Sequence, residues 1–430
     1  MEYVSLQLGD EESAPPPAPS APPMSDSLFQ PRPPPGRPSA PSPPHAPRPH
    51  GAMGDALESF EVHVSDPTKQ GTGMQAFVSY NVTSKTSLQQ YRNPENTVPR
   101  RYNHFVWLHS QLIEEYPCCF IPVLPDKSGI NPMFNRFQED FVEGRKIALE
   151  QYLLRLARHP VIQSSKPLQT FFEGDESLMR LPEEKKPSFL GGIFKELSVT
   201  PKAPRVADEE FDAMRVYVRE LEGQLAELHK FLERLVRRRK DLASSLAELG
   251  LTLITMAGHE GQSGGEEAGK AFTDLGSCCD HLAISLQQQS NDEAKKALMV
   301  VDDWLRVVRG AKDAIKRRGE QGGNTVLLRQ EADRKTKVLA AGNGGKQGVT
   351  EADVMELSRR VEESARKCEA LSERVRSEME AMKRQKSAEL RAMLCGFVRV
   401  QVQYGSEVQK SWERVLPSLV AGLDPQALDF

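Results

Sequence analysis

Aromatic residues, long apolar runs and metal-ligand motifs are all scarce in this chain. Only 7% of its 430 residues are aromatic, which is lean for a single globular enzyme. No apolar run reaches the roughly 18 residues of a transmembrane helix, and no apolar segment behind a basic start predicts a secretory signal. The six cysteines include no Cys-x-x-Cys pair. We therefore expect a cytosolic protein with reduced thiols, no disulfide and no zinc.

An excess of positive charge is also missing. The chain holds 56 Lys+Arg against 60 Asp+Glu, a net charge of -4. This balance excludes nucleic-acid binding through bulk positive charge, so any anion must be bound locally. No complete phosphate-binding loop and no His/Cys metal set occurs. We therefore expect a protein that is not an enzyme and needs no cofactor or metal.

Proline is concentrated at the start of the chain. The first fifty residues hold 16 of the 31 prolines, interleaved with alanine and serine. Such a segment cannot bury enough apolar surface to order itself. Residues 1–57 are therefore predicted to form a disordered, proline-rich tail. The alternative is a docking site of the Pro-x-x-Pro type, for example at 31–34.

Residues 58–176 carry the pattern of a small α+β domain. Phe60, Val62 and Val64 alternate with polar residues, a second alternating run covers 76–82, and a third short strand ends at Arg101. A helix from an N-cap at Asn103 to residue 116 and a longer one over 137–158 follow. Three strands with these helices predict one compact α+β domain.

Residues 205–420 carry the pattern of an all-α bundle. Apolar residues recur in steps of three and four from Phe211 to Met256, and further helical patterns cover 266–318 and 351–416. Gly322 and Gly323 predict a loosened turn after the second helix. None of these helices can bury a continuous apolar stripe alone, so we expect an elongated three-helix bundle.

A local anion site is predicted within the α+β domain. Arg101 ends a strand, where a guanidinium is well placed for a bidentate grip on phosphate. Arg145 shares a helical face with Phe141 and other apolar residues, and a cation in such a stripe needs an anionic partner. The alternative is an internal salt bridge from Arg145 to Glu143 or to a neighbouring carboxylate. Lys127, on a proline-rich loop, is expected to reach the opening of the same anion site.

Three ordered motifs make this region resemble the phosphoinositide-binding PX domain. They are Arg100-Arg101-Tyr102-Asn103-His104-Phe105, Pro122-Val123-Leu124-Pro125-Asp126-Lys127 and Phe141-Val142-Glu143-Gly144-Arg145-Lys146-Ile147-Ala148-Leu149. The resemblance implies that phosphatidylinositol 3-phosphate is the ligand.

Each residue of that predicted site takes its role from the resemblance. Arg101 would bind the 3-phosphate, Tyr102 would pack on the inositol ring, and Lys127 would meet the 1-phosphate. Arg145 would bond the ring hydroxyls, and Arg100 would support the site. His104 stands where the family commonly has an acidic residue.

The domain order resembles the sorting nexins with a C-terminal BAR domain. Matching phrases include 63–67 and 269–276, and the similarity covers 58 to about 420. The resemblance implies a curved antiparallel dimer, either a homodimer or a heterodimer with a related BAR-type sorting nexin. It also implies work beside the retromer cargo-selecting subunits, on the cytosolic face of early or late endosomes.

Three further segments are predicted to contact an anionic membrane. The first is an apolar loop, for which the alternative is that its side chains form a small core within the folded loop. The second is an amphipathic helix in the linker 177–204, for which the alternative is packing on a neighbouring domain. The third is a basic tip within 312–337, a stretch that contains eight basic and four acidic residues. The alternative is a solvated loop. These residues are Ile130, Met133 and Phe134 in the loop, Phe189, Leu190, Ile193, Phe194 and Leu197 in the helix, and Lys312, Lys316, Arg317, Arg318, Arg334, Lys335 and Lys337 in the tip.

The function predicted from these features is a two-signal membrane module. The pocket would recognise the lipid, and the bundle would supply dimerisation and curvature. The competing hypothesis is a coiled-coil endosomal scaffold or tether that binds lipid and partners without bending membranes.

Overall fold

The computed structural model describes residues 60–72, 76–125, 139–179, 208–263, 265–342 and 348–420. Four of the expectations above lie outside this part of the chain. They concern the proline-rich tail, Lys127, the apolar loop with Ile130, Met133 and Phe134, and the amphipathic helix over 189–197.

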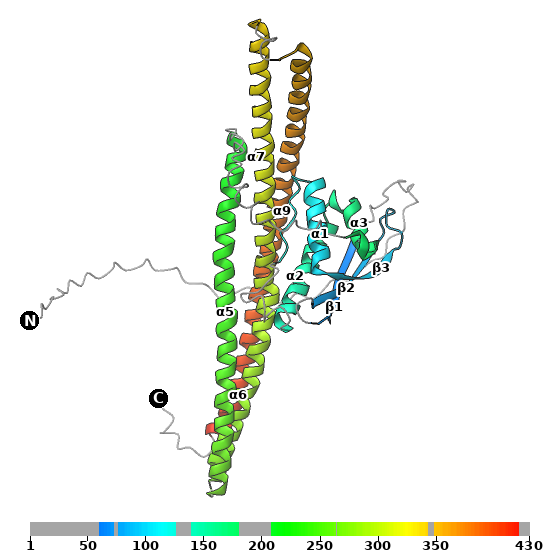
Figure 1. The fold of residues 1–430 in the computed structure, drawn as a ribbon. Helices are drawn as coiled ribbons and strands as arrows, with labels where there is room; N and C mark the ends of the chain where they lie inside the picture. The colour runs from blue at the N-terminus through cyan, green and yellow to red at the C-terminus, as the bar shows by residue number, and fades with distance from the viewer. Residues whose placement is uncertain are drawn as a thin grey trace, which may run out of the picture. The chain divides into compact units, whose positions relative to one another are not determined.

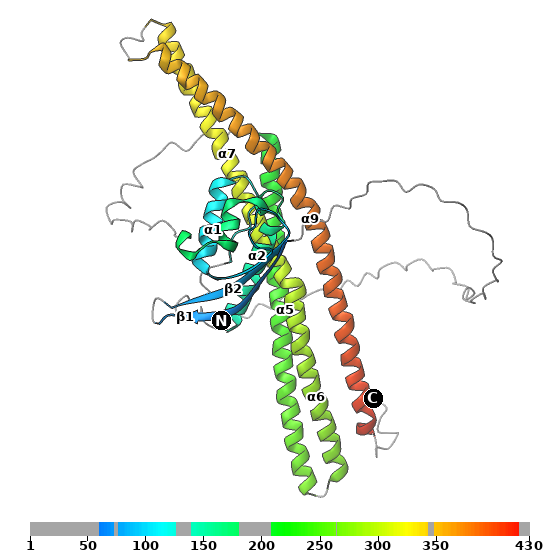
Figure 2. The same ribbon diagram turned by 90° about the vertical axis from the view of Figure 1, so that its right-hand side faces the viewer.

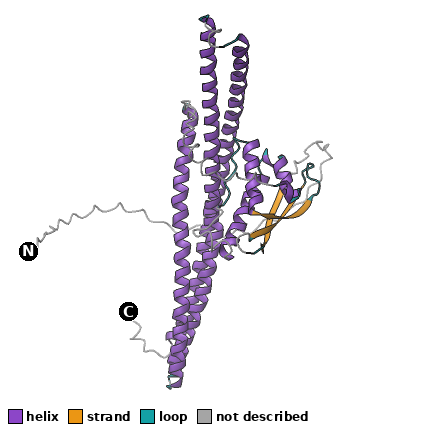
Figure 3. Cartoon of the chain, viewed as in Figure 1, coloured by secondary structure: helices purple, strands orange, loops and turns teal. Residues whose placement is uncertain are grey.

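A three-stranded antiparallel sheet opens the described chain, as predicted. Its strands are β1 (Phe60–Gln70), β2 (Phe77–Thr86) and β3 (Glu95–Arg101), in the order β1-β2-β3 (Figure 3). Val82 of β2 pairs with Val64 on one side and Val98 on the other. The period-2 alternation thus places one apolar face of the sheet toward the helices.

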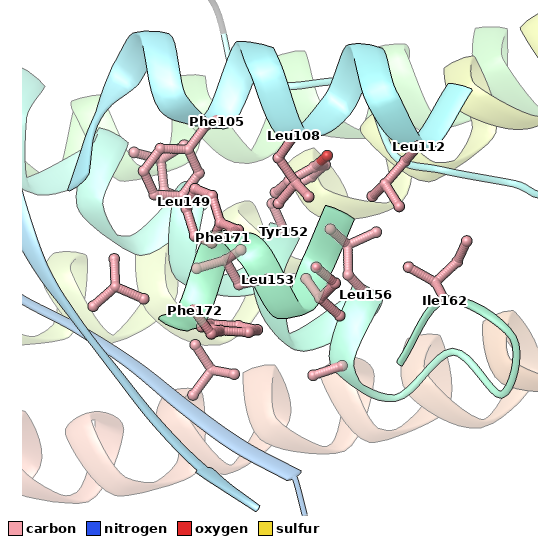
Figure 4. Close-up of a cluster of buried hydrophobic side chains, with 14 of the residues drawn as sticks. Phe105, Leu108, Leu112, Leu149, Tyr152, Leu153, Leu156, Ile162, Phe171 and Phe172 are labelled. Carbon is pink, nitrogen blue, oxygen red and sulfur yellow. The ribbon is translucent and has the colours of Figure 1, made fainter. Parts of the chain in front are cut away.

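Helices cover that face and complete the first core. They are α1 (Tyr102–Glu115), α2 (Glu139–Ala157), η3 (Ile162–Ser164), α3 (Lys166–Glu173) and η4 (Glu176–Leu178). Figure 4 shows Phe105, Leu108 and Leu112 of α1 directed at Leu149 and Tyr152 of α2. All five side chains are buried, so the two helical stripes meet each other as their spacing predicts.

The predicted start of α1 was wrong by two residues. Asn103 lies inside the helix, and Arg101 is its N-cap. The backbone N–H of Arg101 donates to Nδ1 of His104 at 3.3 Å. His104 thereby satisfies a backbone donor at the helix start, a task that usually falls to Glu or Gln at this position.

Long helices make up the rest of the described chain. They are α5 (Glu209–Gln262), α6 (Glu266–Glu293), the π-helix η5 (Ala294–Leu298), α7 (Met299–Ala340) and α9 (Glu351–Val420). Figures 1 and 2 show α5 beside α6 and α7 beside α9. None of the described helices is apolar enough over a sufficient length to cross a bilayer.

The predicted end of the second helix was wrong. It does not stop near Arg318, because α7 continues through Gly322 and Gly323, both buried, to Ala340. Thr325 of α7 and Ser364 of α9 lie 2.7 Å apart through their hydroxyl oxygens. Packing and hydrogen bonding against α9 outweigh the roughly 1 kcal/mol that each interior glycine costs.

An irregular segment after α1 belongs to two cores at once. Cys118 and Phe120 are buried in the helical bundle, whereas Cys119 and Ile121 are buried in the α+β core. Local turns set its path, because the amide of Cys119 donates to the carbonyl of Tyr116 at 3.2 Å and the amide of Ile121 donates to the carbonyl of Cys119 at 3.0 Å. The segment thereby joins the two parts of the fold.

The backbone of this segment lies directly against α7. The amide of Val123 donates to the carbonyl of Arg306 at 3.1 Å. A Cβ placed on Gly310 would lie 2.0 Å from the carbonyl oxygen of Ile121. Glycine is therefore required at this point because any side chain would collide with backbone atoms.

Ion pairs between α2 and the bundle reinforce this contact. Arg155 donates to Asp303 at 2.7 Å and also bonds Glu389, while its guanidinium lies 4.7 Å from the ring centroid of Trp304. His159 pairs with Glu378 at 3.0 Å. We call this region, from the 118–123 segment to these pairs, the junction.

Candidate functional site

The side chain of Arg101 is placed so that its guanidinium group can bind a ligand. It ends β3, it is half-buried, and its Nε donates to Nε2 of His104 at 3.2 Å. Its guanidinium carbon lies 5.3 Å from the ring centroid of Phe77. Within the described ranges, neither of its Nη groups makes a hydrogen bond or ion pair. The end of the side chain is therefore available to an anion.

His104 holds Arg101 without neutralising it. Burial lowers the pKa of His104 to about 4, and the nearby charges of Arg101 and Arg100 add to this effect. The imidazole is therefore neutral near pH 7, so at any one time it accepts from either the backbone N–H or the Nε of Arg101, and not from both. An acidic residue here would compensate the Arg101 charge, whereas a neutral histidine leaves it to the ligand.

Arg145 lies between two aromatic rings. Its guanidinium carbon is 4.2 Å from the ring centroid of Phe141 and 5.0 Å from that of Tyr102. Burial places the pKa of Arg145 below its usual value, while Tyr80 and Tyr102 act in the opposite direction. Glu143, the alternative partner from the sequence, pairs instead with Lys146 at 2.7 Å.

Tyr102 is the point where the three sequence motifs meet. It follows Arg101 in the chain, and its ring faces Arg145 of the helix motif. Its hydroxyl donates to the carbonyl of Pro125, in the proline motif, at 2.6 Å. Residues more than forty positions apart are thereby gathered around one ring. Lys127 follows two residues after Pro125, outside the described part.

Arg100 differs from Arg101 in every respect that matters for binding. Only 1% of its surface is exposed, and it donates to the carbonyls of Phe171, Gly174 and Pro99. Burial lowers its pKa to about 10. Arg100 therefore anchors the end of α3 and supports the site without reaching a ligand.

The predicted basic tip is divided by the structure, which corrects the sequence interpretation. Arg318 is buried, pairs with Asp208 at 2.8 Å and lies 3.6 Å from the ring centroid of Phe211. Lys312, Lys316 and Arg317 also lie in the body of α7. Lys312 and Lys316 pair with Glu222 and Glu320, and Arg317 donates to the carbonyl of Pro117. Only Arg334, Lys335 and Lys337 lie in the last turns of α7.

The junction residues had no signal in the sequence. Arg155 and its partners Asp303 and Glu389 are separated by 148 and 234 positions. Each is an ordinary charged residue in a helical pattern, which predicts a solvated face. Only the fold brings them together.

Comparison with known proteins agrees with this arrangement. Residues 89–175 match the family model for the PX domain, and residues 189–418 match the model described as Vps5 C terminal like. An α+β lipid-binding domain followed by this helical region defines a PX-BAR protein.

Similar proteins identify the family more closely. The chain is 33% identical over 383 residues to Sorting nexin 1 of Arabidopsis thaliana, covering 84% of this chain and 93% of that protein. It is 27% identical over 393 residues to human Sorting nexin-2, covering 86% and 74%, respectively. The chain belongs to the sorting nexins. Members of this family are peripheral endosomal proteins that act in protein transport and are not enzymes.

A solved structure supports the fold. The cryo-EM structure of the SNX-BAR Mvp1 tetramer aligns with a TM-score of 0.60 and 14% identity, covering 83% of this chain and 99% of that one. At this identity the likeness concerns the fold alone. The predicted order of an α+β PX domain and a BAR-type helical bundle is confirmed.

Proposed function

We propose that the chain binds phosphatidylinositol 3-phosphate through Arg101, Tyr102, Lys127 and Arg145. One observation carries this proposal: among the described residues no partner takes the two Nη groups of Arg101, and the ring of Tyr102, the next residue, lies 5.0 Å from the guanidinium carbon of Arg145. Two arginines, one directly before Tyr102 in the chain and one over its ring, suit a phosphorylated inositol, because arginine pairs with phosphate and an aromatic ring packs on a sugar face.

Recognition by a pocket agrees with the charge of the domain. Residues 58–176 hold 12 basic and 14 acidic side chains. A net negative surface does not attract anionic membranes in general. Specific lipid binding at a few cations is therefore the mode that the domain supports.

We also propose that two chains associate through the bundle. On α5, Leu242, Leu249 and Met256 recur every seven residues and are 50%, 48% and 45% exposed. On α9, Val402 and Trp412 are 68% and 42% exposed. The seven-residue spacing on α5 is characteristic of a helix that packs against a partner. A homodimer or a heterodimer with a related sorting nexin would cover these exposed side chains.

The resulting assembly would act on the cytosolic face of early or late endosomes. We propose that it senses or induces curvature and works beside the retromer cargo-selecting subunits. The loop at Ile130, Met133 and Phe134, the helix over 189–197 and the basic end of α7 would add membrane contacts. The alternative is a tether, which would bind the same lipid and leave vesicle shape unchanged.

Sedimentation of the full chain with liposomes tests the lipid site. Arg101→Ala should weaken binding to vesicles containing phosphatidylinositol 3-phosphate at least tenfold, since each charged hydrogen bond contributes about 1.5–3 kcal/mol. Arg92→Ala is the matched control, because Arg92 is an exposed arginine of the same domain. Equal binding by Arg101→Ala and wild type would refute the site.

Electron microscopy of the same vesicles tests the second part of the proposal. The wild-type chain should convert vesicles into tubules and should prefer small vesicles over large ones. Unchanged vesicle shape at saturating protein would favour the tether instead.

A further inference from the structure

A cavity of about 620 Å³ lies at the junction, where α2 packs against η5, α7 and α9. It does not involve Arg101, Tyr102 or Arg145. Ile147 and Leu154 of α2 face Met299 and Val300 of α7 across it. Its size is within the range of sites that hold small ligands or short peptide segments, and its apolar lining would favour an aliphatic group.

Three cations that line this cavity have no carboxylate partner among the described residues. Lys295 and Lys296 come from the π-helix η5, and Arg158 follows the end of α2. All three side chains are exposed, and none forms an ion pair within the described ranges. Arg155 differs, because Asp303 and Glu389 already neutralise it. The cavity therefore has an excess of positive charge that an acidic ligand would balance.

The lining also contains an acceptor for which the described part of the chain supplies no donor. Asp303 is only 4% exposed, and its Oδ2 is bonded to Arg155. Its Oδ1 is buried and has no hydrogen-bond partner in the described part of the chain. A buried carboxylate oxygen in this state favours a ligand that brings an N–H group. A phosphate group brings no N–H donor to this oxygen.

A second cavity extends this site toward the junction segment. It measures about 150 Å³, and it shares Arg155, Arg158 and Glu389 with the larger cavity. The two hollows therefore adjoin along the contact between the α+β domain and the bundle. An extended ligand can occupy such a groove better than a compact one.

We propose that this cavity binds a short acidic peptide segment of a partner protein. An aliphatic side chain of the peptide lies against Met299 and Val300. Its carboxylates meet Lys295 and Lys296, and a backbone N–H donates to Oδ1 of Asp303. Because both walls belong to different parts of the fold, the site exists only in the chain that contains both. The inference is independent of the lipid site.

A display library of random octapeptides, selected on the full chain, tests the proposal. Wild type should enrich peptides in which Asp or Glu adjoins Leu, Ile or Met. Gly396→Leu should reduce that enrichment at least tenfold, because residue 396 lines the cavity and a Cβ there lies 3.8 Å from Lys296, an ordinary contact. Gly223→Leu is the matched control, since this glycine of α5 is exposed and has open space around it.

Charge reversal provides the second readout. The best enriched peptide should bind the Lys295→Glu, Lys296→Glu double variant at least tenfold more weakly than wild type. Both side chains are exposed, so the variant is expected to fold normally. Selection that is identical on wild type and on Gly396→Leu overturns the proposal. The same holds if the double variant loses binding to phosphatidylserine vesicles while peptide selection is unchanged, because the cations would then serve the membrane.

Discussion

Replacing Gly310 with alanine should separate the two parts of the fold. The new Cβ would lie 2.0 Å from the carbonyl oxygen of Ile121, 2.7 Å from its carbonyl carbon and 3.3 Å from Cα of Pro122, whereas ordinary contacts begin at 3.4 Å. Backbone atoms cannot rotate away as the end of a side chain can. The segment and α7 must therefore move apart over their shared contact.

The cost can be worked out from the parts of this contact. Forced overpacking costs about 1–3 kcal/mol, and loss of the hydrogen bond from Val123 to Arg306 adds about 1 kcal/mol. The better helix propensity of alanine returns about 1 kcal/mol. We expect a net destabilisation of the junction by about 1–3 kcal/mol.

Native-state hydrogen exchange at the Val123 amide measures this free energy directly. Because about 1.4 kcal/mol corresponds to a factor of ten, protection should fall by about 5-fold to 150-fold in Gly310→Ala. Gly396→Ala is the control, since its Cβ meets nothing closer than 3.8 Å; it should leave protection unchanged or raise it. If Gly310→Ala behaves like the control, the close approach of α7 to the segment is not real.

Three further predictions concern charge, pH and association. Arg155→Ala should lower the free energy of unfolding, measured by chemical denaturation, by about 3–5 kcal/mol because it leaves a buried carboxylate without its partner. Arg376→Ala, whose partners are exposed, should lower it by less than about 1 kcal/mol. Equal losses of stability in the two variants would contradict the argument from burial. His104 and His109 have folded pKa values of about 4, below the unfolded value near 6.5. Their contribution to folding stability is therefore complete above pH 6.5 and is lost as the pH falls toward 4, and protonation of each should lower the free energy of unfolding by roughly 2 kcal/mol at pH 4.5. Urea midpoints that do not change with pH would refute this. Leu249→Asp should convert dimers into monomers in analytical ultracentrifugation, and a persistent dimer would exclude the α5 stripe from the interface.

Periodic patterns predicted most of the fold. Alternation at Phe60, Val62 and Val64 identified a strand with one buried face, and all three side chains are buried. Steps of three and four identified helices as long as α5. Such patterns are visible because each residue contributes to one local geometry.

The errors in the sequence interpretation have a common physical cause. The start of α1 depends on a histidine that replaces the usual capping residue, and the continuation of α7 past Gly322 depends on contacts with α9. Both are decided by particular partners in space. The ion pairs of Arg155 are more distant still, and no local pattern could have predicted them. The gathering of Arg101 and Arg145 was expected only through resemblance to a family.

The alternating segment from Cys118 to Ile121 has a practical consequence for work with fragments. A fragment ending after η4 would expose Cys118 and Phe120 to water, and a fragment starting at α5 would lack the two side chains that fill its own interior. Neither fragment therefore reproduces the packing that it has in the intact protein. Affinities and melting temperatures measured on separate fragments should differ from those of the whole chain, because each fragment has either exposed apolar side chains or an unfilled space in its core.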